Sequence, residues 1–364
     1  MTRIIAGRLP FLDIHCGCER IIVSEPLQRV SALAGIPPLL QEFEVEIEEV
    51  FDGLDVRRED LFAENRIPVR SAMHMLDQCA KATGCDHFGV LLGMRFTLDY
   101  LGLVGEAMAC ASTLRDALED FVSIQPGFSQ GLCYYLIPFG DSVAFGAAIY
   151  DRHHEGRQQA YGVSLAAAVS VVRILSQGNV RPLEVRFNHR APEDAAPYHR
   201  LLKCPVLFNQ DQTCVMLSRQ DFEWKNPRAD AARCQQLLSA VRKVAGLEQL
   251  PALMRLRHEL WPLFSRSISS LEAAAGRLAM HPRALNRRLE QDGTTFAEER
   301  DRARFIMARE LLDATDLPVG DIAAAVAYEN HSAFVRAFRK WSGGSPSDWR
   351  DRSRQALDQG EEAT

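Results

Sequence analysis

Two similar stretches in the last third of the chain constrain its fold most, because each has the pattern of a helix, a turn and a second helix. In the first, apolar residues recur at i, i+3, i+4 and i+7, which predicts a short helix with one buried face over Leu271–Leu278. The run breaks at Met280–His281. Pro282 then suits the first position of a new helix, where its missing N–H costs nothing, and Leu285 and Leu289 would face inward.

The second stretch repeats this pattern further along the chain. Ile322–Val326 predicts its first helix, Tyr328–His331 its turn, and Phe334 and Phe338 the inward side of its second helix. Successive residues of a helix are rotated by about 100°, so residues opposite the inward pairs face outward, where Arg and Asn can bind base edges or phosphates. The residues predicted to face DNA are Arg283, Asn286, Arg287 and Glu290 in the first stretch and His331, Ser332, Val335, Arg336, Arg339 and Lys340 in the second. Lys340 and Arg350 are predicted to be available for phosphates.

A long helix is predicted between the two stretches, over Phe296–Thr315. About 20 residues at roughly 1.5 Å each span about 30 Å, close to the roughly 34 Å between successive major grooves on one face of B-DNA. One chain could therefore read two adjacent grooves. The alternative is that these are ordinary paired helices whose arginines form a solvated face, but two units in phase at this separation favour DNA binding.

The second unit also carries the residues of a known family. Ala333–Lys340 followed by Gly344–Arg350 resembles the DNA-binding domain of AraC/XylS-type regulators. One departure is the pair Ala327-Tyr328, where that family usually has Gly-Phe before the turn. The resemblance implies a transcription regulator, and of the two kinds an activator is expected. It also implies that the protein acts as a homodimer and that RNA polymerase is a partner.

The first part of the chain has a mixed pattern that predicts an α+β domain. Helices are predicted over Val69–Thr83, from Ser112 or Thr113 onward, and over Gln158–Leu175. Strands are predicted as a hairpin of Leu132–Ile137 with Val143–Ile149 joined by Pro138–Ser142, a strand at Leu183–Phe187, and a second hairpin of Val206–Phe208 with Cys214–Leu217. This order resembles the arabinose-binding-type effector domain of one branch of the same family, on the segments Leu101–Gly105, Pro182–Phe187 and Cys204–Phe208.

The predicted fold is therefore an α+β N-terminal effector domain followed by an all-α DNA-binding domain of two helix-turn-helix units joined by a long helix. Residues 1–219 are predicted to form the effector-binding and oligomerisation domain, and 250–354 the DNA-binding domain. The segment 220–249 is polar and holds Pro227, which indicates the connection, and 355–364 is an acidic tail.

The composition bears on how the chain could bind DNA and on where in the cell it is expected. The net charge of −6 is carried largely by Glu42–Glu49 and the tail, so arginine placement must supply any local positive potential, and non-specific affinity for DNA is predicted to be modest. No apolar run approaches the roughly 20 residues needed to cross a bilayer. The first residues lack the pattern of a signal peptide. A cytoplasmic location is expected.

The cysteines give no strong sign of a metal or cofactor. There are nine, an odd number, set mostly in apolar stretches, which is typical of reduced core thiols. His15–Cys18 has ligand-like spacing, but no second cluster accompanies it, so we predict neither metal nor cofactor.

A small-molecule pocket is expected in the N-terminal domain, with aromatic walls and a few polar or cationic groups. The candidates are Tyr134, Tyr135, Phe145, His153, His154 and Arg186, each of which could instead be plain core or loop.

Two other functions compete with a ligand-responsive regulator. A methyl-accepting DNA-repair enzyme would need an activated, exposed cysteine in a basic setting, and a constitutive architectural binder would need a strongly basic surface. The chain is accordingly predicted not to be an enzyme.

Overall fold

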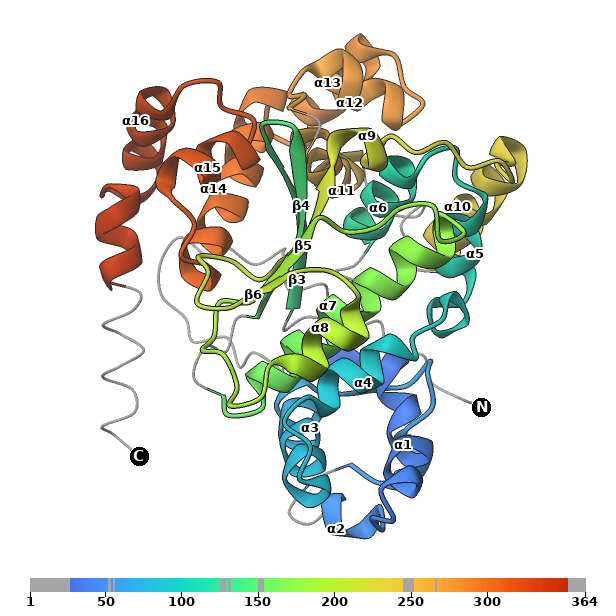
Figure 1. Ribbon diagram of the computed structural model, residues 1–364. Helices are drawn as coiled ribbons and strands as arrows, with labels where there is room; N and C mark the ends of the chain where they lie inside the picture. The colour runs from blue at the N-terminus through green and yellow to red at the C-terminus, as the bar shows by residue number, and fades with distance from the viewer. Residues whose placement is uncertain are drawn as a thin grey trace.

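The computed structural model describes residues 27–51, 54, 56–124, 129, 132–149, 154–244, 252–265 and 267–352. The predictions for His15–Cys18, His153 and the acidic tail at 355–364 lie outside these residues. Figure 1 shows a central sheet with one group of helices below it and a second group, formed by the last third of the chain, above it.

The N-terminal helices lie below the sheet and to its right (Figure 1). Strand β1 (Leu27–Arg29) pairs antiparallel with β2 (Arg66–Pro68). Helix α3 (Val69–Thr83) has the predicted bounds and ends at Gly84, whose left-handed φ of 61° suits a glycine. The other elements here are α1 (Ile36–Glu42), α2 (Glu48–Phe51), α4 (Phe88–Met94), α5 (Leu103–Cys110), α6 (Leu114–Ile124) and short 3-10 turns at Ser31–Gly35, Arg58–Asp60 and Leu98–Leu101.

The central sheet has the strand order β3-β4-β7-β5-β6. Its strands are β3 (Leu132–Phe139), β4 (Ser142–Ile149), β5 (Glu184–Arg186), β6 (Val206–Leu207) and β7 (Cys214–Ser218). The first predicted hairpin is confirmed, with strands that extend through Phe139 and from Ser142, so the turn is only Gly140-Asp141. The second predicted hairpin is wrong. β6 pairs in parallel with β5 at the edge, whereas β7 lies between β4 and β5. Val185 has a pairing partner on each side, Val206 and Val215.

Helix α7 (Arg157–Leu175) crosses the lower face of the sheet and packs on α4 (Figure 1). Most of its residues are buried, as expected for a helix covered on several sides. The two helices approach so closely that a Cβ on Gly93 would lie 2.4 Å from the carbonyl oxygen of Val163. Glycine at this position is therefore a packing requirement.

The segment predicted as the connection contains two helices, α9 (Arg219–Phe222) and α10 (Ala231–Val244), after α8 (Ala196–Leu202). Helix α10 packs on α5, where Arg233 pairs with Glu106 at 3.3 Å and Val241 is buried in the N-terminal core. The described part of the connection is therefore helix that belongs to the N-terminal half.

The C-terminal half is all helical, which confirms the predicted fold class. It consists of α11 (Ala252–Ser265), α12 (Leu271–Arg277), α13 (Pro282–Gln291), α14 (Phe296–Ala314), α15 (Val319–Ala325) and α16 (His331–Ser342). Helix α14 begins with a capping box in which Thr295 and Glu298 bind each other's backbone N–H. Its 19 residues span about 28 Å at roughly 1.5 Å each.

Both faces of the sheet are buried, each in a different core. Side chains on the lower face, such as Leu136 and Phe145, belong to the core around α7. Tyr135 and Ile137 on β3 and Ala148 on β4 point the other way and are buried in the core of the C-terminal helices. The Tyr135 ring occupies the space above Gly146, where a Cβ would be 2.1 Å from a ring carbon. The hairpin thus takes part in both halves of the molecule.

None of the helices in the described parts of the chain combines the length and apolar character that crossing a membrane requires.

Candidate nucleic-acid interface and ligand pocket

The two helix-turn-helix turns have the same hydrogen bonds. In the first, Met280 N donates to Ala275 O and Ala279 N to Gly276 O. In the second, Tyr328 N donates to Ala323 O and Ala327 N to Ala324 O. These pairs are those of a Schellman motif, which requires one left-handed residue, and here that residue is alanine both times, with φ of 53° at Ala279 and 57° at Ala327.

Side-chain caps fix where the second helix of each unit begins. His281 Nδ1 accepts from Arg283 N at 3.2 Å at the start of α13. At the start of α16, Asn330 Oδ1 accepts from Ser332 N at 2.8 Å and Ala333 N at 3.2 Å. The caps hold α13 and α16 in equivalent positions after their turns.

The residues predicted to face outward on α13 and α16 lie on the surface, with two exceptions. The inward pairs Leu285 and Leu289, and Phe334 and Phe338, are fully buried. Asn286 and Val335 are half-buried, and Val335 packs against the C-terminal core. The exposed members of the two faces are Arg283, Arg287 and Glu290 on α13 and His331, Ser332, Arg336, Arg339 and Lys340 on α16.

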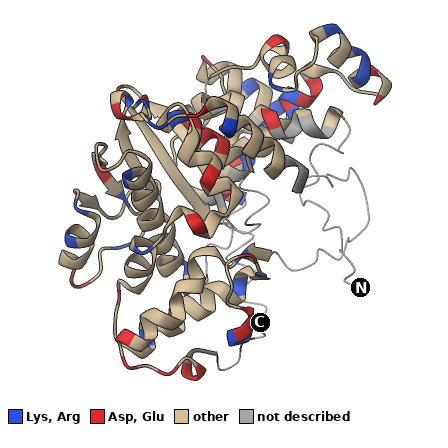
Figure 2. Cartoon of the chain, turned by 90° about the vertical axis from the view of Figure 1, so that its right-hand side faces the viewer, with Lys and Arg blue, Asp and Glu red and all other residues tan. Residues whose placement is uncertain are grey.

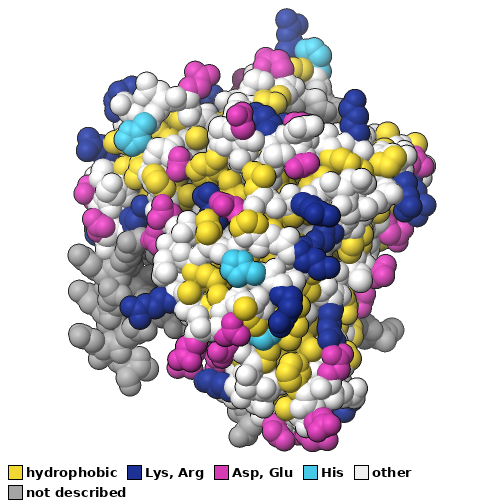
Figure 3. All heavy atoms as spheres, in the orientation of Figure 1, with side chains coloured by type: hydrophobic (Ala, Val, Ile, Leu, Met, Phe, Trp, Pro, Cys, Tyr) yellow, Lys and Arg dark blue, Asp and Glu magenta, His cyan; other side chains and the backbone are white. Residues whose placement is uncertain are grey.

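Lys and Arg are present at these faces but are not confined to them. Figure 3 shows Lys and Arg side chains at the top and at the upper left edge of the molecule, where Figure 1 places α13 and α16. Elsewhere Lys and Arg are interspersed with Asp and Glu (Figure 2). That the exposed arginines of α13 and α16 supply the local positive potential for DNA stays a prediction from the net charge of −6.

The second unit is braced by a buried arginine. Arg304 on α14 donates from Nε to Val326 O at 3.0 Å and from its terminal nitrogen to Ala327 O at 2.8 Å, so it binds the turn directly. Its guanidinium also lies 4.3 Å from the centre of the Tyr328 ring. Arg350 donates to Leu317 O, and the prediction that it is available for phosphates was therefore wrong, because the guanidinium satisfies a helix-flanking carbonyl.

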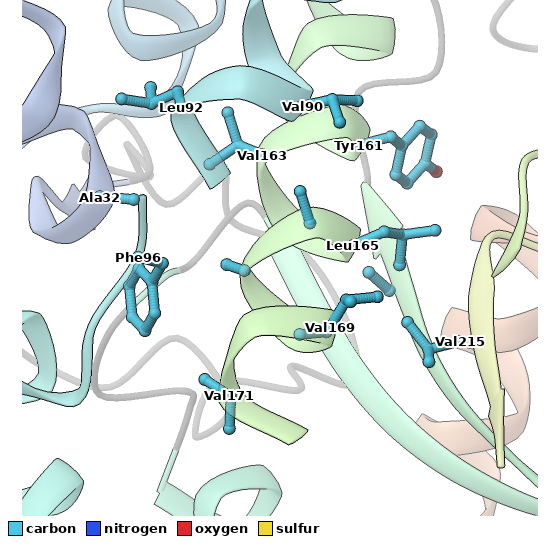
Figure 4. Packing of buried hydrophobic residues seen from close by; sticks show 14 of the residues in the cluster. Ala32, Val90, Leu92, Phe96, Tyr161, Val163, Leu165, Val169, Val171 and Val215 are labelled. Carbon is cyan, nitrogen blue, oxygen red and sulfur yellow. The ribbon is translucent and has the colours of Figure 1, made fainter. Parts of the chain in front are cut away.

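A pocket of about 140 Å³ lies in the N-terminal half, between β1, α3, α6, α7 and the β3–β4 hairpin. Its walls are mostly aliphatic and aromatic. Ala32, Phe96 and Val163 line it and lie on one side of α7 in Figure 4, whereas Leu165 is on the other side, toward Val215 of β7. Polar groups at the wall come from Gln28, Arg29, Ser31, Ser129, Tyr134 and Ser164.

The structure brings two of the predicted pocket residues together. Tyr134 and Phe145 line the pocket with stacked rings whose centres are 5.6 Å apart, and Phe121 from α6 meets Tyr134 edge-on at 5.2 Å. Burial raises the pKa of Tyr134, and a hydrogen bond with Ser164 opposes this. The phenol is therefore protonated at neutral pH.

The other predicted pocket residues lie elsewhere. Tyr135 is on the opposite face of β3, and its hydroxyl meets Gln212 Oε1 at 3.3 Å. Arg186 pairs with Glu184 on its own strand. His154 accepts from Gly156 N at 3.1 Å in the loop before α7. Sequence reasoning missed Arg29, Met73, Leu76 and Ser164, because these pocket residues come from separate elements that only the fold brings together.

Three of the described cysteines, Cys79, Cys204 and Cys214, do not have the character of reactive thiols. Burial raises the pKa of Cys204 to about 11 and that of Cys79 and Cys214 to about 12. Such thiols are protonated at neutral pH and therefore poor nucleophiles. Among the residues that the structure describes, no three His, Cys, Asp or Glu side chains are grouped as metal ligands.

Two helix-turn-helix units with exposed arginines on their second helices, attached to a domain with a pocket, define a DNA-binding transcription regulator with an effector-type domain. Comparison with known protein families identifies the family of regulators to which the chain belongs. Residues 45–226 match the family described as the arabinose-binding domain of AraC transcription regulators, N-terminal, and residues 274–352 match a helix-turn-helix domain family. The chain belongs to the AraC family of transcription regulators.

Individual relatives are distant but extend over most of the chain. The ornithine utilization regulator of Pseudomonas aeruginosa is 26% identical over 319 residues, which cover 86% of this chain and 93% of the relative. The regulator VirS of Mycobacterium tuberculosis is 26% identical over 323 residues, 86% of this chain and 90% of the relative. The crystal structure of CdpR from Pseudomonas aeruginosa is similar at 25% identity with a TM-score of 0.40, covering 72% of this chain and 86% of that one.

Proposed function

We propose that this regulator activates transcription when a small molecule occupies the pocket between α3, α7 and the β3–β4 hairpin. In this proposal it works in the cytoplasm as a homodimer, reads two successive major grooves with α13 and α16, and contacts RNA polymerase. Residues 1–219 carry the pocket and the dimer contacts, and 250–354 carry the DNA contacts.

The observation that supports a ligand response is that neighbouring residues of one hairpin belong to the pocket and to the DNA-binding half. Tyr134 and Phe145 line the pocket, whereas Tyr135 and Ile137 are buried against the C-terminal helices. A ligand that repositions the strand must move both sets, because successive strand residues share one backbone. Such a ligand would bind the two arrangements with different affinity, which is what an effector requires.

A second route joins the pocket to the first helix-turn-helix unit. Phe121 lines the pocket, and its neighbour Asp120 on α6 lies 3.8 Å from Arg277 on α12. Arg277 also pairs with Glu259 on α11, so the same guanidinium joins α6, α11 and α12. A backbone hydrogen bond of 3.0 Å from Asp316 N to Asp211 O connects the halves at another point.

A metabolite panel tests the ligand response, with thermal shift for binding and a promoter reporter for regulation. We expect at least one compound to raise the unfolding temperature and to change reporter output. The proposal fails if no compound does either and if removal of residues 1–249 leaves regulation unchanged.

A matched pair of substitutions tests the hairpin. The first is Ile137→Val, because Ile137 lies on the hairpin face toward the DNA-binding half. The second is Ile149→Val, because Ile149 lines the pocket on the same hairpin. We expect Ile137→Val to reduce the change in DNA affinity caused by a bound compound while leaving the affinity for the compound nearly unchanged in the absence of DNA. Ile149→Val should alter the affinity for the compound itself. If Ile137→Val leaves the coupling intact, the hairpin does not carry it.

The dimer is tested by sedimentation of the full chain and of the two separated parts, 1–249 and 250–354. We expect the N-terminal part to be dimeric and the C-terminal part monomeric. Because the separated N-terminal part would expose Ile137, a version with Ile137→Asp serves as control for association through that face. A dimeric C-terminal part with a monomeric N-terminal part would contradict the assignment.

A further inference from the structure

We infer that the pocket takes a small monocarboxylate, with its apolar body among the walls of α3, α7 and the β3–β4 hairpin and its carboxylate on Arg29, close to Arg66. The inference rests on the proposed function, because it treats this pocket as the effector site. It specifies the chemical class of the ligand, which neither membership of the family nor the presence of a pocket specifies.

The size and lining of the pocket define the body of the ligand. At about 140 Å³ it is close to an engineered apolar cavity of about 150 Å³ that holds benzene. The walls include Met73, Leu76, Phe96 and Phe145, which offer no hydrogen bonds beyond weak ones at sulfur. The body is therefore apolar and has about six carbon atoms.

The charge at the pocket comes from a pair of arginines on the small β1–β2 ladder. Arg29 lines the pocket, and Arg66 is its direct cross-strand partner, so both side chains leave the ladder on the same face. Like charges placed directly opposite each other across two strands destabilise the pair. Arg66 is exposed and does not itself line the pocket; partial desolvation and, second, the charge on Arg29 lower its pKa. Both arginines have other partners, and a carboxylate bound at Arg29 would in addition reduce the repulsion between the two guanidinium groups.

Arg29 is also held in position to receive an anion. Its Nε donates to Ala63 O at 3.0 Å, which fixes the plane of the guanidinium, and its side chain is only 19% exposed. Glu64 contacts a terminal nitrogen at 3.8 Å, longer than a hydrogen-bonded ion pair, and is itself 67% exposed. A planar guanidinium that is preorganised in this way suits a carboxylate better than a point-charge lysine would.

Three probes of the same length and different charge test the class of ligand: hexanoate, hexanamide and hexylamine. Calorimetric titration of the full chain should show hexanoate binding at least tenfold more tightly than hexanamide, and hexylamine more weakly still. The inference is overturned if hexanamide or hexylamine binds as well as hexanoate, or if none of the three binds. A different compound from the metabolite panel that binds and regulates would then leave the proposed function standing without this ligand class.

Variants of the two arginines test where the carboxylate lies. Arg29→Gln should remove the preference for hexanoate over hexanamide, Arg29→Lys should restore part of it, and Arg66→Gln should reduce it about threefold. Arg58→Gln is the matched control, because Arg58 is an exposed arginine in the same part of the fold that does not line the pocket. Circular dichroism checks that each variant is folded, and the ratio of affinities for the two probes in one variant does not depend on how much of it is folded. An unchanged ratio in Arg29→Gln would place the carboxylate elsewhere and overturn the inference.

Discussion

The two helix-turn-helix units are the same at their turns and different in what holds them. Both turns have the same pair of hydrogen bonds and a left-handed alanine. The first unit is tied by Arg277 to α11 and to Asp120 of the effector domain. The second is fixed by Arg304 and by an aromatic cluster that includes Phe305, Trp341 and Trp349.

This difference suggests a division of labour between the units. The ion pair between Arg277 and Asp120 of the effector domain is long, at 3.8 Å, and partly exposed, so it is weak and readily rearranged. The first unit is therefore the one that a change in the effector domain can reposition. Aromatic packing and a buried arginine keep the second unit in one arrangement. We therefore expect the first unit to carry more of the response and the second to anchor the protein on DNA.

The largest effect is expected for Arg304→Ala. It removes two hydrogen bonds from the second turn and a cation–π contact, and it leaves two carbonyls unpaired. We expect a loss of about 2–4 kcal/mol in the free energy of unfolding, measured by chemical denaturation. Arg309→Ala on the same helix is the control and should cost little. Equal losses of stability in the two variants would show that Arg304 does not specifically stabilise the second unit.

The next largest effects are expected for the equivalent arginines on the two reading helices. Arg287→Ala and Arg336→Ala should each reduce specific binding by about 1–3 kcal/mol and relax base preference in separate half-sites about one helical turn apart. The half-buried Val335 makes phosphate contact the alternative for Arg336. Selection of preferred sites with each variant decides between them. If Arg287→Ala keeps the parent's site preference, the reading face of α13 has been misplaced.

The alanines at the two turns should respond alike, since the turns are the same. A left-handed alanine costs roughly 1–2 kcal/mol, and glycine in turn loses about 0.5–1 kcal/mol of chain entropy, so Ala279→Gly and Ala327→Gly should each stabilise by about 0.5–1 kcal/mol. Ala324→Gly lies inside α15 and should destabilise. Thermal unfolding gives the sign for each variant, and destabilisation at Ala327 alone would show that the turns differ after all.

The smallest effect is expected for Lys340→Ala, at the end of α16. A phosphate contact is lost equally on all sequences, so the slope of log K against log salt should fall by about 1 unit with no change in site preference. Titration of the specific site and of a scrambled duplex at several salt concentrations measures it. A changed base preference would instead make Lys340 a reader of sequence.

Local patterns predicted the helices with a clear apolar period, but not α10 or α11, and pairing over long distances was not predicted. The bounds of α3, the position of the β3–β4 hairpin and the exposed faces of α13 and α16 follow from periodicity, caps and breaks, which are properties of neighbouring residues. The false hairpin arose because β7 follows β6 in sequence but joins β4 and β5 in space. No local signal specifies that choice, since the apolar Val206 and Val215 suit either partner.

The pocket shows the same limit at the level of single residues. Alternation along β3 indicates that Tyr134 and Tyr135 face opposite ways, but only the packing of α7 decides that Tyr134 is the one in the pocket. Arg29 could not be assigned from the sequence, because its place depends on pairing with a strand 37 residues further on, at Arg66.

The hairpin that belongs to two cores bears on how such regulators could be recombined. An engineer who fuses the effector half of one relative to the DNA-binding half of another would cut near residue 250, where the chain passes from one half to the other. The upper face of the hairpin, at Tyr135, Ile137 and Ala148, would then meet a foreign set of helices. A working chimaera should therefore be built with these three positions taken from the donor of the DNA-binding half, although they lie more than a hundred residues before the junction.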